Sequence, residues 1–177
     1  MNHTSERINV SDLGAIARFQ APPEWKEVTE EDSEAGGFNR IYYSRDFSPG
    51  IPAVTLSLFF RGTLVSDTSA KKFQNLLHKP DHELSPEEIN SLSQVLSKLA
   101  DEDAFLIRNC ATVSISGRRV LVVDGEWKTS QTHFHGLMVD ADESAREIQE
   151  IFFEAPAEAF EKYLKAVLES IRIIEWK

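Results

Sequence analysis

The stretch from Glu147 to Ile173 reads EIQEIFFEAPAEAFEKYLKAVLESIRI, and it predicts a strand that runs directly into an amphipathic helix. The first part is rich in apolar and aromatic residues, as strands in a sheet usually are. A proline then precedes an apolar stripe at positions i, i+3, i+4, i+7, i+8 and i+11, which is the pattern of a helix with one buried face. The stripe consists of Phe160, Tyr163, Leu164, Val167, Leu168 and Ile171. The apolar tail that follows, as far as Trp176, is expected to add a closing strand or to pack on the sheet.

Upstream of this stretch, several segments have the composition or alternation of strands. They are residues 15–21, 40–45, 53–61, 105–114, 118–129 and 132–140. The clearest is 53–61, in which Val54, Leu56, Leu58 and Phe60 share one face and Thr55, Ser57 and Phe59 share the other. Turn signals such as Ser48–Pro49–Gly50 and Ser116–Gly117 separate neighbouring strands, which predicts antiparallel pairs. Gly125, inside 118–129, predicts a bulge.

Two helical segments are expected between residues 68 and 100. Apolar residues recur at helical spacing from Thr68 to Lys79. The second helix, Ser85 to Leu99, starts with a capping box of Ser85 and Glu88, and Pro86 takes the first helical position. Paired strands with helices inserted once and appended once favour the α+β class over an alternating βαβ fold.

The composition favours one acidic domain. The chain has 177 residues, of which 19 are Lys or Arg and 29 are Asp or Glu, so the net charge is −10. We expect a flexible segment over 1–13, a single domain over 14–177 with a helical insertion at about 68–100, and an exposed acidic loop around 30–37. Nucleic-acid binding is not expected, because it requires clustered basic residues that neutralise phosphates.

Cysteine content and the first residues bear on the compartment. Cys110 is the only cysteine, which excludes an internal disulfide and a Cys-based zinc site. Residues 1–10 include Glu6 and Arg7 and have no apolar run, so we expect no signal peptide. No stretch approaches the roughly 18 apolar residues of a membrane helix. The sequence therefore predicts a cytoplasmic protein without membrane insertion.

The two ends of the chain resemble the PsbP/Mog superfamily, which includes the DcrB-like proteins of bacteria. Residues 19–25, FQAPPEW, look like the strand and Pro…Trp turn of that family. Residues 147–153, the following helix and the SIRI of 170–173 are similar to its final strand, helix and terminus. The resemblance implies a central antiparallel sheet with helices on both faces, a C-terminal amphipathic helix, and a non-catalytic role in binding or assembly. The helix expected over 85–99 departs from the family pattern as an insertion.

Among the patterns that could bind a metal, two histidines in an expected strand are the clearest. His133 and His135 flank Phe134 in an expected strand, so alternation places both imidazoles on one face. Zinc, copper or nickel would be suitable ions, but the sequence supplies only Asp140 or Asp142 as nearby further ligands. The alternative is a pair of solvent-facing histidines, and no cofactor is otherwise expected.

No catalytic motif is recognisable. The chain has no nucleophile elbow, no P-loop and no dinucleotide fingerprint. Cys110 follows Arg108 by two residues, yet it has no identifiable histidine partner, and a small packed residue is the simpler interpretation. We therefore expect a protein without enzymatic activity.

The aromatic residues offer a second kind of site. Phe59 and Trp127 would line an apolar groove for a partner helix or a hydrophobic ligand if their sheet face were open. The alternative is that the middle helices cover this face. The leading interpretation is a small adaptor or assembly domain that binds another protein, and the middle helices also offer a surface for a homodimer.

Overall fold

The computed structural model describes residues 9–32, 37–44, 53–59, 63–97 and 99–177. The strands are β1 (Asn9–Leu13), β2 (Ile16–Gln20), β3 (Lys26–Asp32), β4 (Gly37–Tyr43), β5 (Thr55–Phe59), β6 (Thr63–Leu64), β7 (His82–Glu83), β8 (Phe105–Ile115), β9 (Arg118–Trp127), β10 (Thr132–Asp140), β11 (Glu147–Pro156) and β12 (Glu175–Trp176). The helices are α1 (Asp67–Leu77), α2 (Pro86–Ser91) and α3 (Ala157–Arg172).

A large antiparallel sheet forms the centre of the fold. Its strand order is β3-β4-β5-β11-β10-β9-β8-β7, and β6 also pairs with β11. Strands β8 to β11 follow one another as a meander, because each is joined to the next by a short turn. The meander returns to β5, so β11 lies in the middle of the sheet with partners on both sides.

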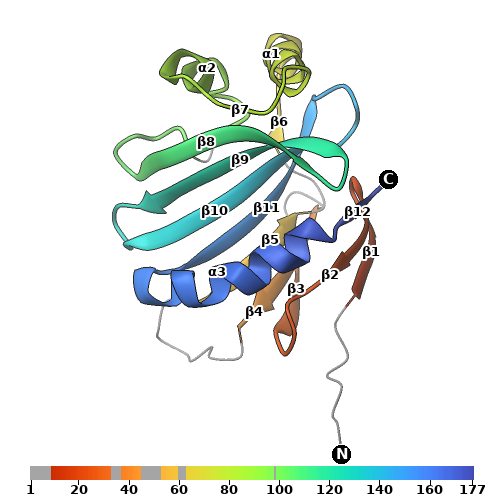
Figure 1. The fold of residues 1–177 in the computed structure, drawn as a ribbon, viewed down its shortest axis with the longest axis vertical. Coiled ribbons are helices and arrows are strands. Elements are labelled where there is room, and N and C mark those ends of the chain that lie inside the picture. Colours follow the sequence, from red (N-terminus) through yellow and green to blue (C-terminus); the bar gives the residue numbers. More distant parts are fainter. Residues whose placement is uncertain (1–8, 33–36, 45–52, 60–62, 98) are drawn as a thin grey trace, which may run out of the picture.

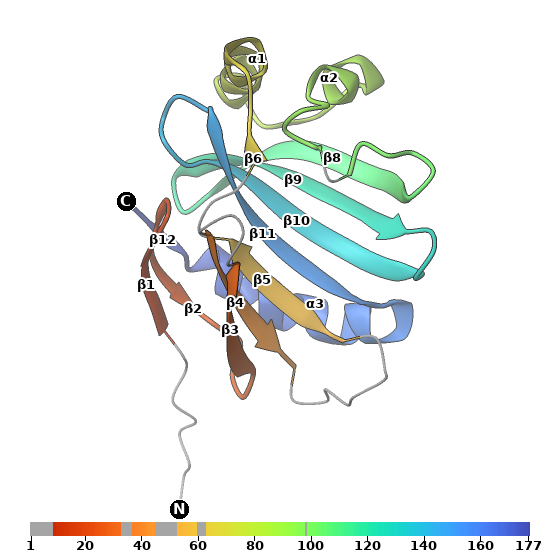
Figure 2. The ribbon, with the colours of Figure 1, turned by 180° about the vertical axis from the view of Figure 1, so that it is seen from behind.

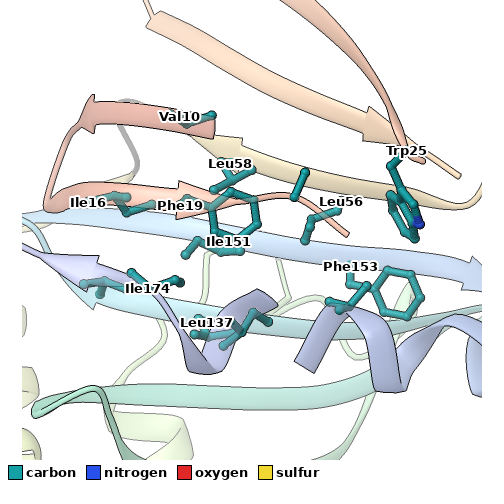
Figure 3. Close-up of a cluster of buried hydrophobic side chains, with 14 of the residues drawn as sticks. Val10, Ile16, Phe19, Trp25, Leu56, Leu58, Leu137, Ile151, Phe153 and Ile174 are labelled. Carbon is teal, nitrogen blue, oxygen red and sulfur yellow. The ribbon is translucent and has the colours of Figure 1, made fainter. Parts of the chain in front are cut away.

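One face of this sheet is covered by α3 and by a small sheet of order β1-β2-β12. Figure 1 shows α3 lying across β10 and β11 on this side. The apolar stripe of α3 is buried as expected, with Phe160, Tyr163, Val167 and Ile171 inside the core. Figure 3 shows Phe19 of the small sheet packed close to Leu58 and Ile151 of the large one.

A second apolar core lies on the opposite face. Alternation along β9 directs Val120 and Val122 toward α3, whereas Leu121 and Val123 belong to the core that includes Phe73 of α1. Figures 1 and 2 show α1 and α2 together beside β8. The expected α+β fold, a large antiparallel sheet with helices, is therefore confirmed.

The expected helix from Ser85 to Leu99 is wrong in its length. The capping box is present, since the Ser85 hydroxyl accepts from the Glu88 N–H and the Glu88 carboxylate accepts from the Ser85 N–H. However, α2 ends at Ser91, and the chain continues through short turns in which Leu99 N–H donates to Leu96 C=O. The apolar stripe still reaches the core, because successive tight turns also bring residues three or four apart to one side.

Two expected loose segments contain strands. Asn9–Leu13, assigned from the sequence to the flexible segment, pairs with β2 and buries Val10 and Leu13. Two apolar side chains in five residues were too weak a signal to predict this strand. Residues 30–32, expected in an acidic loop, continue β3 instead. An edge strand accepts charged residues because one side of it faces solvent. The expected turn at 48–50 and the side chain of Phe60 lie outside the described residues.

The bulge expected at Gly125 is present, but the extra residue lies on the partner strand. The register between β8 and β9 shifts between Ile107 and Asn109, opposite Gly125. A Cβ atom on Gly125 would come within 2.4 Å of the Leu106 carbonyl oxygen and 2.5 Å of the Phe105 ring. Glycine is therefore required here by the close approach of β8.

Candidate functional site

Phe59 and Trp127 belong to a row of aromatic rings across the sheet face opposite α3. The ring centroids of neighbours are 5.3 Å apart for Phe59–Phe152, 4.8 Å for Phe152–Phe134, 5.3 Å for Phe134–Phe105 and 4.8 Å for Phe105–Trp127. The three central rings are buried, and Phe59 and Trp127 are half-buried at opposite ends. The row packs with the helical segment, and a groove lined by Phe59 and Trp127 stays a prediction.

Trp127, at one end of this row, forms a hydrogen bond with a carboxylate of β11. Its indole Nε1–H donates to Glu154 Oε1 at 2.6 Å. Burial of Glu154 raises its pKa, and the hydrogen bond from Trp127 opposes that effect. The Trp127 ring is therefore oriented by its partner on β11, and its outer edge contributes to a shallow pocket of about 360 Å³ that His133 also lines.

His133 and His135 lie on one face of β10, as alternation predicts, and that face is turned toward α3. The His133 ring contacts Phe160 of α3 with centroids 5.4 Å apart. His135 Nδ1 lies 2.6 Å from Asp124 Oδ1, and His133 Nε2 lies 3.6 Å from Glu126 Oε2. Each imidazole is thus placed beside a carboxylate of the neighbouring strand β9.

Asp124 is the centre of this polar network. Burial disfavours its charge, but hydrogen bonds from His135 and Asn109 outweigh burial and lower the pKa of Asp124. Within the described ranges, no three His, Cys, Asp or Glu side chains converge as metal ligands would. The conformations of both histidines are therefore explained by their carboxylate partners on β9. A metal site at His133 and His135 stays a prediction.

Cys110 and the connection between α1 and α2, which contains Asp81 and His82, are held by structural contacts. Burial and the charge of Asp124 raise the pKa of Cys110 to about 12, so the thiol is protonated at neutral pH. His82 lies 3.3 Å from Glu88, and Asp81 forms a 2.7 Å ion pair with Arg119. These contacts attach the connection between α1 and α2 to the sheet.

A concave site with a partly apolar wall lies between α2 and β8. We call it the α2–β8 groove; it is an open depression of about 580 Å³, lined mainly by Ile89, Asn90, Ser93, Leu96, Phe105 and Ile107. Leu96 and Phe105 form buried parts of its wall, whereas Asn90 and Ser93 are exposed at its rim. Leu106, on the same strand as Phe105, also lines the groove and is 41% exposed.

The strand that borders the groove has an open edge. The short strand β7 pairs with β8 only at Ala111 and Thr112. Among the described residues, no strand pairs with the outer edge of β8 from Leu106 to Asn109. Unpaired backbone groups along an edge can form hydrogen bonds with an added strand.

Acidic residues lie at the end of the groove where β8 begins. Asp101, Glu102 and Asp103 are consecutive and exposed, and the last two line the groove. Lys128 is the basic residue of the lining, and its ammonium group donates to the Glu102 carbonyl oxygen. The side-chain charges at this end therefore remain predominantly negative.

Sequence reasoning identified the apolar residues of this region but missed the groove. The stripe from Ile89 to Leu99 was expected on a continuous helix, which would have presented a convex surface. The depression forms because the helix stops at Ser91 and because β7 covers only part of β8. No local signal in the sequence predicts where a two-residue strand pairs.

Comparison with known proteins identifies a likeness of fold. No protein-family model matches the chain, and no curated protein matches it in sequence. The chain is similar to the solution structure of cyanobacterial PsbP (CyanoP) from Synechocystis sp. PCC 6803, with a TM-score of 0.55 and 7% sequence identity over 100% of this chain and 97% of the other. At this identity the likeness shows the fold alone, so the expected PsbP-like fold is confirmed and the narrower likeness to DcrB-like proteins is not. None of the helices in the described ranges has a hydrophobic stretch that would span a lipid bilayer.

Proposed function

We propose that this chain is a non-catalytic binding domain that holds a partner protein in the α2–β8 groove. The observation that carries the proposal is the combination of an apolar wall and an unpaired strand edge at one place on the surface. Apolar side chains such as Leu106 gain free energy when a partner removes them from water, at roughly 25 cal/mol per Å² of buried area. An edge strand gains hydrogen bonds in the same event.

The polar network around Asp124 supports the same proposal from the other side of the sheet. Its ionisable groups satisfy one another, through pairs such as Asp124–His135 and Glu126–Arg108. A catalytic site would instead need a reactive group directed at a substrate. The chemistry of the α2–β8 groove, with carbon on its wall and charge at its rim, is that of a protein interface.

Site-specific photo-crosslinking in the cells from which the chain comes tests the proposal. A crosslinking side chain at Asn90, which is exposed and lines the groove, should produce a reproducible covalent adduct with one protein. The same side chain at Ser97, which is exposed but is not part of the groove lining, serves as the matched control. The additional substitution Ser93→Trp should fill the groove and remove the Asn90 adduct. Equal adducts at Asn90 and Ser97, or an Asn90 adduct indifferent to Ser93→Trp, would show that the partner binds elsewhere.

A further inference from the structure

The outer edge of β8 has a defined open segment. At one end, Phe105 N–H donates to Asp101 C=O at 2.8 Å, and at the other end Cys110 C=O accepts from Leu84 N–H at 2.8 Å. Between these two bonds lie Leu106 to Asn109, the residues without an outer strand among those described. An extended chain is the ligand that satisfies such a row of backbone groups, because its own donors and acceptors have the same spacing.

The groove beside this edge selects the side chains of such a ligand. Side chains of an added strand point alternately to the two sides of the sheet. One set would therefore enter the α2–β8 groove, where the half-buried Ile89 and Ile107 present carbon, and an aliphatic side chain matches that surface. The other set would lie on the opposite side of the sheet.

The charge at one end of the groove also determines which ligands are attracted to it. Glu102 and Asp103 line one end of the groove, and the chain carries a net charge of −10, so a ligand with lysine or arginine is attracted and an acidic ligand is repelled. The same charge argues against a second copy of this chain as the occupant. Two copies joined at this edge would each carry the net charge of −10, which opposes their association.

The bulge at Arg108 limits the length of the added strand. A bulge twists an edge and interrupts regular pairing, which protects proteins against unselective strand addition. Pairing at this edge is therefore short, and the anchor in the groove must supply much of the affinity. Selectivity then depends on an apolar side chain in the correct register.

We propose that the α2–β8 groove binds an extended basic peptide segment of a partner, which adds as a strand to the edge of β8 and inserts an aliphatic side chain between β8 and α2. This inference rests on the proposed function and adds the chemistry of the partner to it.

The probe is a fluorescent synthetic peptide, Lys-Val-Lys-Leu-Lys-Val, with both ends blocked. Its fluorescence anisotropy, measured on titration with the full chain, should reveal saturable binding that Ser93→Trp weakens about tenfold, equivalent to about 1.4 kcal/mol. Ser97→Trp should leave it within about twofold. Replacing each lysine of the probe by glutamate should abolish binding, and added salt should weaken it because the charges are exposed.

Two further measurements distinguish strand addition from simple occupation of the groove. N-methylation of alternate backbone nitrogens of the probe removes hydrogen-bond donors without changing its side chains, and one of the two possible methylation patterns should reduce binding about tenfold. Bound probe should also slow hydrogen exchange of backbone amides within Leu106–Asn109 of β8.

Each negative result would contradict a different part of the proposal. If Ser93→Trp weakens binding but methylation and amide exchange show no effect, strand addition is overturned while the groove remains a binding site. If the probe does not bind although Asn90 crosslinks to a protein, the basic, extended partner is overturned and the proposed function stands. If the free chain sediments as a dimer with the Leu106–Asn109 amides already protected, a second copy occupies the edge and the inference is wrong.

Discussion

Gln149 joins the two sheets through a fully buried side chain. Its amide nitrogen donates to the carbonyl oxygens of Leu13 and Phe59, each at 2.9 Å, and its oxygen accepts from Ala15 N–H at 2.7 Å. These partners lie at the turn between β1 and β2 and at the end of β5. Gly14 is required beside it, because a Cβ atom there would lie 2.7 Å from the Gln149 carboxamide.

Gln149→Leu should therefore destabilise the protein by about 3 kcal/mol, since it removes the buried hydrogen bonds to Ala15 N–H and Leu13 C=O and a third bond to Phe59 C=O. Urea unfolding, followed by circular dichroism, measures the change in the free energy of unfolding. The matched control is Gln74→Leu, because Gln74 makes one exposed hydrogen bond to Glu143 C=O. A loss for Gln149→Leu no larger than that for the control would contradict the role of Gln149 as a tie between the sheets.

Asp124 makes part of the stability dependent on pH. Burial alone would raise the pKa of Asp124, but hydrogen bonds from His135 and Asn109 outweigh it and hold the folded pKa below its ordinary value. A carboxyl group with a lowered pKa contributes stability above its unfolded pKa, and the contribution is lost as pH falls toward the folded pKa.

Asp124→Asn should thus cost about 1 kcal/mol near neutral pH and progressively less below about pH 4. The free energies of unfolding of both proteins, measured from pH 7 downward, give this difference directly. Glu169→Gln, an exposed change on α3, should show little effect at any pH. A difference for Asp124→Asn that stays constant into the acid range would rule out ionisation of Asp124 as its source.

Glu88 caps the start of α2 and also connects this helix to the end of α1. Its carboxylate accepts from Ser85 N–H at 3.0 Å and pairs with Lys79 at 2.8 Å, just beyond the end of α1. The hydrogen bond from Lys79, followed by that from the Ser85 backbone, lowers the pKa of Glu88 to about 2. The wall of the α2–β8 groove therefore depends on a capping interaction that the sequence predicts.

The Glu88 carboxyl carbon, followed by NMR, should titrate near pH 2. Glu88→Gln should reduce stability by about 1 kcal/mol, the usual contribution of an N-terminal cap, because the exposed ion pair adds little. Glu87→Gln, at the adjacent exposed position, is the control. A normal carboxyl titration for Glu88 would show that the Lys79 and Ser85 contacts do not persist in solution.

The helices also show how far sequence patterns can predict this fold. Ser85, Pro86 and Glu88 predict the start of α2 because capping is a local interaction. The stripe from Ile89 to Leu99 predicts which side chains are buried, but it does not predict that hydrogen bonding changes after Ser91. Burial depends on spacing alone, whereas the end of the helix depends on packing against distant strands.

The same distinction applies to the candidate sites. Alternation predicts that His133 and His135 share a face, but their carboxylate partners come from β9, and that register is set by the whole meander. The α2–β8 groove depends even more on contacts between residues that are distant in the sequence. It requires β8 to be an edge over Leu106–Asn109, and this follows only from the short pairing of β7.

The complete fold depends on closure of the small sheet by the C-terminus. Strand β12 pairs with β2, and Trp176 Nε1–H donates to Ile115 C=O at 2.8 Å in the large sheet. Arg118 lies over the Trp176 ring, 5.6 Å from its centroid, and Lys177 N–H donates to Ala15 C=O at 3.0 Å. The three terminal residues therefore form a second connection between the small sheet and the large one, in addition to Gln149.

Deletion of residues 175–177 should lower the free energy of unfolding by about 2–3 kcal/mol, because it removes a half-buried tryptophan together with its hydrogen bonds. Lys177→Ala removes the ion pair with the exposed Asp12 and should have little effect on the free energy of unfolding. If both sheets share one core, the truncated chain should still unfold in a single transition when tryptophan fluorescence and circular dichroism are compared. Two separate transitions would instead show that β1 and β2 fold as a unit of their own, and the shared core around Phe19 would then not be what holds the molecule together.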